Sequence, residues 1–131
     1  MTDFPLPITA WAALVLGTLF FWLTWRVIGE RQSGKVAHGD GGNSELAKKI
    51  RGQANAAEQM PLGLIVLGLN ELLNPTWVTI LLAVMLVAGR VIHGINFTMP
   101  GTPFIMRPIG MGLTLFSLGF GLIGLAAGLI L

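Results

Sequence analysis

Long apolar segments constrain this chain more than any other feature of its sequence. Three of them, over about residues 7–28, 75–97 and 108–131, have the roughly 20 residues that a helix needs to cross the hydrocarbon core of a bilayer. A shorter apolar run over residues 61–73 ends a helical pattern that starts near residue 44, where the stretch "GDGGNSE" supplies a loop and a candidate N-cap. The sequence therefore predicts four helices, of which the second has about thirty residues and a polar first half.

Composition agrees with a protein that lies in a membrane. Hydrophobic residues make up 53% of the 131 residues and charged residues only 11%, with a mean hydropathy of +0.76, whereas about 25% of the residues in a soluble domain are charged. The first apolar segment is too long for the core of a signal peptide, and Asp3 rather than a basic residue precedes it, so we expect it to be retained. At the third segment, "NPTW" predicts Asn74 as the helix cap and Pro75 in the first turn. We expect one domain over residues 1–131, an all-α integral membrane protein built as a bundle of four transmembrane helices.

The basic residues indicate how these helices are oriented. The polar segment between the first two apolar runs carries Arg31, Lys35, Lys48 and Lys49, and the last connection ends in Arg107, whereas "NELLNPT" and both chain ends carry no basic residue. The positive-inside rule therefore predicts that both termini face the outside and that the two basic connections face the cytoplasm. Because most basic residues lie between apolar runs and the net charge is only +2, we expect membrane topology rather than a nucleic-acid partner to explain them.

The absence of cysteine limits the chemistry that the chain can perform. Without cysteine there is no disulfide, no thiolate metal site and no cysteine nucleophile, and two isolated histidines do not form a ligand cluster of the usual spacing. We therefore expect no metal. Any thiol chemistry needs a thiol that the substrate brings.

Polar residues from all four helices are predicted to lie near the cytoplasmic leaflet. On the second helix, residues 51, 55 and 58 follow each other at steps of four and three, so they form one stripe. On the third helix, residues 90 and 93 are neighbours on one face. The set that a four-helix bundle would bring together consists of Arg26, Arg51, Asn55, Glu58, Arg90, His93 and Arg107.

Each member of this set also has a purely structural interpretation. Arg26 and Arg107 lie at helix ends, where arginine commonly extends to lipid headgroups. Glu58 is costly near hydrocarbon unless it is paired, and its structural alternative is an ion pair with Arg51 or Arg90. Asn55 and His93 have ordinary packing roles in membrane bundles, the first as an amide bonded between helices and the second as a buried imidazole.

Taken together, several arginines, one carboxylate and one amide suit a particular class of ligand. Guanidinium groups bind carboxylates with two parallel hydrogen bonds, and a glutamate accepts an ammonium group. A small zwitterionic peptide with more than one anionic group meets this description.

The same residues carry a resemblance to a known family. The stretch "RGQANAAEQMP" resembles the second-helix signature RxxxNxxExxP of the MAPEG family, the membrane-associated proteins in eicosanoid and glutathione metabolism, at Arg51, Asn55, Glu58 and Pro61. "GRVIHGINF" resembles the third-helix motif of that family, and the loop "GKVAHGDGGNSEL" resembles its bacterial branch of small inner-membrane proteins. The resemblance covers nearly the whole chain. It departs from the family at tyrosine, because His93 and Phe97 stand where other members have Tyr and the chain contains no tyrosine at all.

The resemblance implies a four-helix protomer in a homotrimer, with glutathione as co-substrate bound between adjacent subunits near the cytoplasmic face of the bacterial inner membrane. By similarity, the three polar residues of the second-helix signature hold the peptide, and Arg107 lies beside the glutathione sulfur and stabilises its thiolate. The thiolate then attacks a hydrophobic electrophile or a lipid hydroperoxide that arrives from the membrane lipids. Further contacts to glutathione are implied for Gln53, Arg26, Arg90 and His93.

Two functions of different class follow from this sequence. The first is a glutathione-dependent membrane enzyme, a transferase or a peroxidase, and it is favoured by Glu58 and Asn55, which a headgroup patch does not need. The alternative is a non-enzymatic membrane protein that keeps the fold and binds an anionic lipid or a peptide, and it is favoured by the missing tyrosine.

Overall fold

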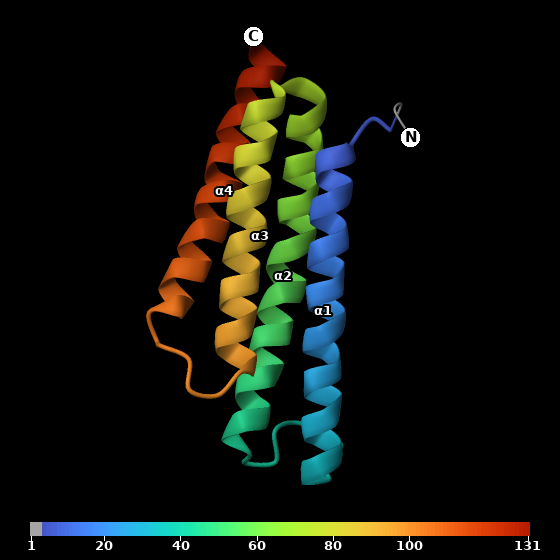
Figure 1. Cartoon of the computed structure of the whole chain (residues 1–131), viewed down its shortest axis with the longest axis vertical. Helices are drawn as coiled ribbons and strands as arrows, with labels where there is room; N and C mark the ends of the chain where they lie inside the picture. The colour runs from blue at the N-terminus through green and yellow to red at the C-terminus, as the bar shows by residue number, and fades with distance from the viewer. Residues whose placement is uncertain (1–3) are drawn as a thin grey trace.

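The computed structural model describes residues 4–131 and contains four α-helices joined by short connections (Figure 1). No strand occurs over these residues, and the predicted all-α architecture is confirmed. The helices are α1 (Pro7–Gly34), α2 (Ser44–Leu73), α3 (Thr76–Thr98) and α4 (Met106–Ile130).

The helix ends agree with the sequence except at two places. As predicted, α2 is one continuous helix of 30 residues, and the side chain of Asn43 caps it by accepting a hydrogen bond from the Leu46 N–H at 3.1 Å. Helix α1 is longer than expected, because it continues past residue 28 to Gly34. It ends where Lys35 adopts a left-handed conformation with φ of 53°, and its N–H turns back to the carbonyls of Arg31 and Gln32.

The predicted cap at Asn74 is wrong. Asn74 ends α2, and Pro75 stands at the N-cap position of α3 without a side-chain bond. The Asn74 side chain instead donates to Asn70 Oδ1 at 3.0 Å and to the carbonyl of Gly124 at 3.1 Å. These contacts with α2 and α4 use the Asn74 amide, and Pro75 already restricts the backbone where α3 begins.

The helices have the length and surface of membrane-spanning segments. Helices α1, α3 and α4 are each long and apolar enough to cross a membrane, and α2 joins a polar first half to an apolar second half. Large apolar side chains cover the outside of the protein, among them Trp11 on α1 and Phe116 and Ile123 on α4. In water such a surface would aggregate, whereas lipid chains solvate it.

Helices α2 and α3 form the centre of the protein (Figure 1). Each of them contacts the other three helices, while α1 and α4 flank the pair on opposite sides and do not touch each other over residues 4–131. The α1–α2 and α3–α4 connections lie at one end, which we call the two-loop end (Figure 1). The α2–α3 connection lies at the opposite end, together with the end of α4.

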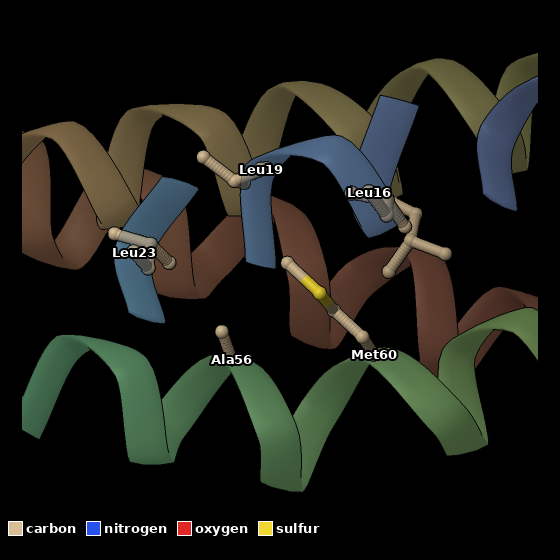
Figure 2. Packing of buried hydrophobic residues seen from close by; sticks show 6 residues of the cluster. Leu16, Leu19, Leu23, Ala56 and Met60 are labelled. Atoms are coloured by element: carbon tan, nitrogen blue, oxygen red, sulfur yellow. The ribbon is translucent and has the colours of Figure 1, made fainter. Parts of the chain in front are cut away.

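One cluster of apolar side chains joins α1 to the central pair. Leu16, Leu19 and Leu23 lie on one face of α1 and are buried against Ala56 and Met60 of α2 (Figure 2). Leu86 of α3 completes the cluster. Because lipid chains are as apolar as leucine, close packing rather than removal from water is what holds these helices together.

Helices α3 and α4 touch through their backbones. A Cβ atom built on Gly110 would lie 2.8 Å from the carbonyl oxygen of Gly89 and 2.8 Å from the backbone nitrogen of His93. Only glycine permits this approach. The contact places the first turn of α4, with Arg107, against the last turns of α3.

The end opposite the two-loop end has its own polar contacts. The carboxylate of Glu71, near the end of α2, accepts hydrogen bonds from the backbone N–H groups of Ile8 at 2.7 Å and Thr9 at 2.8 Å. Asn70 donates to the carbonyl of Gly121 at 2.9 Å and joins α2 to α4. The bonds to Glu71 satisfy backbone N–H groups in the first turn of α1. The predicted ligand residues lie at the other end of the protein.

Candidate functional site

The predicted site residues lie in the half of the protein next to the two-loop end, since α1 and α3 end there and α2 and α4 begin there. The structure divides them into groups rather than one cluster. One group is buried between α2, α3 and α4, one surrounds Arg107, one lies between α1 and its neighbours, and one is exposed on α2.

The buried group is centred on Arg90. Its side chain is only 2% exposed, and Nη1 donates to Asn55 Oδ1 at 2.6 Å while Nε donates to Thr114 Oγ1 at 2.7 Å. Nη2 lies 3.8 Å from the sulfur of Met111. Arg90 therefore ties α3 to both α2 and α4 through neutral acceptors. The sequence predicts that Arg90 contacts the ligand directly. Within one protomer the guanidinium is buried and bonded to Asn55, so it offers a ligand almost no exposed surface.

The exposed group consists of Arg51 and Glu58, two turns apart on α2. Both side chains face away from the other helices of the protomer. Over residues 4–131 the one ion pair joins Lys49 to Glu30, so Glu58 forms neither of the two structural ion pairs considered as its alternative. The same face of α2 continues toward the opposite end with exposed Leu62 and Ile65. Two opposite charges thus lie on a surface that the protomer itself leaves uncovered.

The group around Arg107 combines an amide with aromatic rings. Arg107 Nε donates to Asn96 Oδ1 at 2.8 Å, and the guanidinium carbon lies 4.4 Å from the ring centroid of Phe97 and 5.5 Å from that of Phe104. The side chain is half-buried. The charge is held over aromatic faces, and no carboxylate among residues 4–131 pairs with it.

Phe97 is the link between Arg107 and His93. The His93 ring, 4% exposed, stacks on Phe97 with ring centroids 4.7 Å apart and an angle of 27° between the planes. Gly52 of α2 also packs on Phe97, so closely that a Cβ atom on Gly52 would lie 2.6 Å from the Phe97 Cβ. The two residues that stand where the family has tyrosine therefore form a stack of rings, and the guanidinium of Arg107 lies over the Phe97 ring of this stack.

The remaining predicted residues lie between α1 and its neighbours. Arg26 donates from Nη2 to the carbonyl of Thr98 at 3.2 Å, and Gln53 donates from Nε2 to Thr24 Oγ1 at 3.4 Å. Arg26 Nε and Thr98 Oγ1 are buried without a hydrogen-bond partner among the described residues.

Over residues 4–131 there is no group of three or more His, Asp or Glu side chains that could hold a metal ion.

Comparison with known proteins identifies the family of this chain. The model of the MAPEG family matches residues 9–127. The chain belongs to the MAPEG family. Two relatives, each named "Inner membrane protein YecN", come from Escherichia coli strain K12 and from Escherichia coli O6:H1. Each is 32% identical to this chain over 91 residues, which is 69% of this chain and 70% of the relative.

The MAPEG signature on α2 has two faces in this structure. Asn55 points into the protein toward Arg90, whereas Arg51 and Glu58 point out of it. Sequence reasoning missed the partners Thr114 and Asn96. Helical spacing could have found Thr114, which lies two turns after Arg107 on α4. No spacing marks Asn96, because its partners lie in the connection and on α4.

Proposed function

We propose that this MAPEG protein is a glutathione-dependent membrane enzyme that stabilises the glutathione thiolate and directs it at a hydrophobic electrophile or a lipid hydroperoxide. The observation that carries the proposal is the exposed pair Arg51 and Glu58, which has no ion-pair partner within residues 4–131 and lies on either side of the buried amide Asn55. Charges at membrane depth need partners, and a zwitterionic peptide supplies both signs.

Each residue of the signature has a role in this proposal. Arg51 binds a glutathione carboxylate, Glu58 accepts the ammonium group, and Asn55 bonds to the peptide with an orientation that Arg90 fixes from behind. Arg26 and Gln53, both half-buried, form the surrounding surface, and the buried His93 supports Phe97 by stacking on its ring.

The proposed enzyme is a homotrimer in the bacterial inner membrane. One protomer covers only one side of α2, so the face that carries Arg51 and Glu58 becomes a site when a second protomer packs beside it. The exposed Leu62 and Ile65 on the same face give that contact an apolar part. The location follows the name of the Escherichia coli relatives.

Arg107 is the catalytic residue of the proposed enzyme. Its positive charge, held over Phe97, lowers the pKa of a nearby thiol from the ordinary value of about 8.5 and raises the fraction of thiolate at neutral pH. In the transferase reaction the thiolate attacks the electrophilic atom and displaces its leaving group. In the peroxidase reaction two glutathione molecules reduce a lipid hydroperoxide to the alcohol and water, and glutathione disulfide forms.

A second candidate function rests on Arg26. It lies 5.9 Å from the ring of Trp22 and follows the exposed Trp25, an arrangement typical of side chains that anchor a helix among lipid headgroups. In that case the arginines neutralise anionic lipids, and the protein is a non-enzymatic member of the family that binds a lipid or a peptide.

Ligand-dependent thermal stability separates the two functions. A ligand that binds only the folded protein raises its melting temperature as its concentration exceeds the dissociation constant. We expect reduced glutathione to raise the melting temperature of the purified protein and soluble phospholipid headgroups such as glycerophosphate to leave it unchanged. The reverse pattern would support the lipid-binding function instead.

A further inference from the structure

Asn96 holds a position at the two-loop end that the roles above do not explain. Its side chain is 2% exposed near the end of α3, and every hydrogen-bonding group on it is used. Oδ1 accepts from Arg107 Nε at 2.8 Å, and Nδ2 donates to Thr102 Oγ1 at 2.9 Å and to the carbonyl of Pro103 at 2.9 Å.

The partners leave this amide only one orientation. The carbonyl of Pro103 can only accept a hydrogen bond, so it must face Nδ2, and Arg107 Nε can only donate, so it must face Oδ1. Rotating the amide by half a turn would set two acceptors against each other and two donors against each other. The α3–α4 connection therefore fixes the acceptor that Arg107 binds.

This bond determines how the guanidinium is presented. With Nε engaged by Asn96 and one face of the group over Phe97, the two terminal nitrogens are the part of Arg107 that remains for an anion. An amide orients the guanidinium without cancelling its charge, whereas a carboxylate at the same place would form an ion pair with it. A neutral acceptor is what an arginine needs if it is to stabilise an anion from outside the protein.

We propose that Asn96 is a positioning residue for Arg107, whose neutral amide oxygen aims the terminal guanidinium nitrogens at the glutathione sulfur and preserves their full charge. The inference rests on the proposed function. It adds a residue that belongs to neither the second-helix signature nor the set predicted from the sequence.

Two substitutions at Asn96 test the proposal, one by removing the acceptor and one by giving it a negative charge. Asn96→Leu removes the acceptor, and we expect the thiolate titration of bound glutathione to shift to higher pH and turnover to fall about tenfold, as for the loss of a hydrogen bond to a charged group. Asn96→Asp keeps an acceptor of the same shape but adds a negative charge. We expect a shift in the same direction, because the carboxylate cancels the charge of Arg107.

Thr102→Val is the matched control. It removes the hydroxyl that Asn96 Nδ2 contacts in the connection but leaves the bonds from Asn96 to Pro103 and Arg107 in place. If Asn96 acts through Arg107, this variant loses thermal stability and keeps the wild-type titration. A titration shift as large as that of Asn96→Leu would overturn the proposal, because the connection rather than the bond to Arg107 would then set the thiol pKa.

A variant of Arg107 isolates the bond itself. Arg107→Lys keeps a positive charge but has no Nε–H, so Asn96→Leu should cause little further shift in the Arg107→Lys protein. An equal shift on both backgrounds contradicts the positioning role. In the ligand-free wild type, NMR of the arginine Nε–H groups should give a slowly exchanging signal for Arg107 that Asn96→Leu abolishes.

The outcomes distinguish this inference from the function on which it rests. If the wild type binds glutathione as thiolate and Asn96→Leu and Asn96→Asp both titrate like it, the positioning role is wrong and the proposed function stands. If the wild type does not bind glutathione, the proposed function is wrong, and the positioning role falls with it even where the NMR signal shows the bond.

Discussion

Arg90 Nη1 lies 2.6 Å from Asn55 Oδ1, and this bond joins α3 to the middle of α2 inside the protein. The guanidinium is 2% exposed and its other close partner is a threonine hydroxyl. A buried cation with neutral acceptors depends on each of them, because losing one leaves a donor without a partner. The amide of the family signature is therefore part of the protein interior as well as of the proposed site.

A double-mutant cycle should show that these two residues act together. Asn55→Leu and Arg90→Met should each lower the free energy of unfolding, and the double variant should lose less than the sum. We expect a coupling of about 1 to 2 kcal/mol. In the Arg90→Met protein, removing the Asn55 amide no longer leaves a buried charge without its partner. Thermal or denaturant unfolding in one detergent measures it. Additive losses would mean that the bond contributes nothing.

The backbone contact between α3 and α4 predicts a large effect of one methyl group. In Gly110→Ala the new Cβ would lie 2.8 Å from backbone atoms of α3, so α4 must shift, at a cost of about 1 to 3 kcal/mol in stability. Gly112, on the same helix, has nothing within 4 Å of its would-be Cβ. Gly112→Ala should be neutral or slightly stabilising, since alanine favours a helix over glycine. Equal melting temperatures for the two variants would refute the close approach.

Two glutamates on α2 should separate binding from stability. In Glu58→Gln we expect the affinity for glutathione to fall about tenfold, through loss of a charged contact to the ammonium group, with little change in melting temperature. Glu71 binds two backbone N–H groups of α1 at the opposite end, so Glu71→Gln should lower the melting temperature and leave the affinity unchanged. Calorimetric titration and thermal unfolding give both quantities. Unchanged binding in Glu58→Gln would remove this residue from the site.

Assembly should be required for the site. Since α2 exposes Arg51 and Glu58 on a face that its own protomer leaves open, we expect the protein to assemble in mild detergent. The resemblance to the family implies that the assembly is a trimer, which light scattering or native mass spectrometry measures. A monodisperse monomer that binds glutathione with full affinity would show that the site is complete within one protomer.

The sequence predicts the helices well because their physical causes are local. Segment length, the apolar run and the capping amide at Asn43 are all readable without knowing what packs where. The sequence predicts too early an end for α1 because its last turns are polar, and hydropathy marks the end of the apolar run rather than the end of the helix. The sequence predicts the wrong role for Asn74 because its partner on α4 lies 50 residues away in the sequence.

The candidate site shows the same difference between local causes, which the sequence reveals, and contacts between distant residues, which it does not. The spacing of Arg51, Asn55 and Glu58 identifies one stripe of α2, but only packing decides that the middle residue faces inward. Asn96 has no visible role in the sequence, because its partners depend on the conformation of the connection over residues 99–105. Bonds that cross from one element to another require the fold before they can be recognised.

The thiolate titration of bound glutathione measures the effect of Arg107 on the thiol. Thiolate absorbs in the ultraviolet, so its absorbance against pH gives the thiol pKa in the complex, for the wild type, for Arg107→Leu and for Arg51→Leu as a control that weakens binding first. We expect bound glutathione to ionise below its ordinary pKa of about 8.5 in the wild type and in ligand-saturated Arg51→Leu. In Arg107→Leu the pKa should return toward that value while turnover falls more than affinity does. An Arg107→Leu protein with an unchanged titration and unchanged turnover would contradict the account.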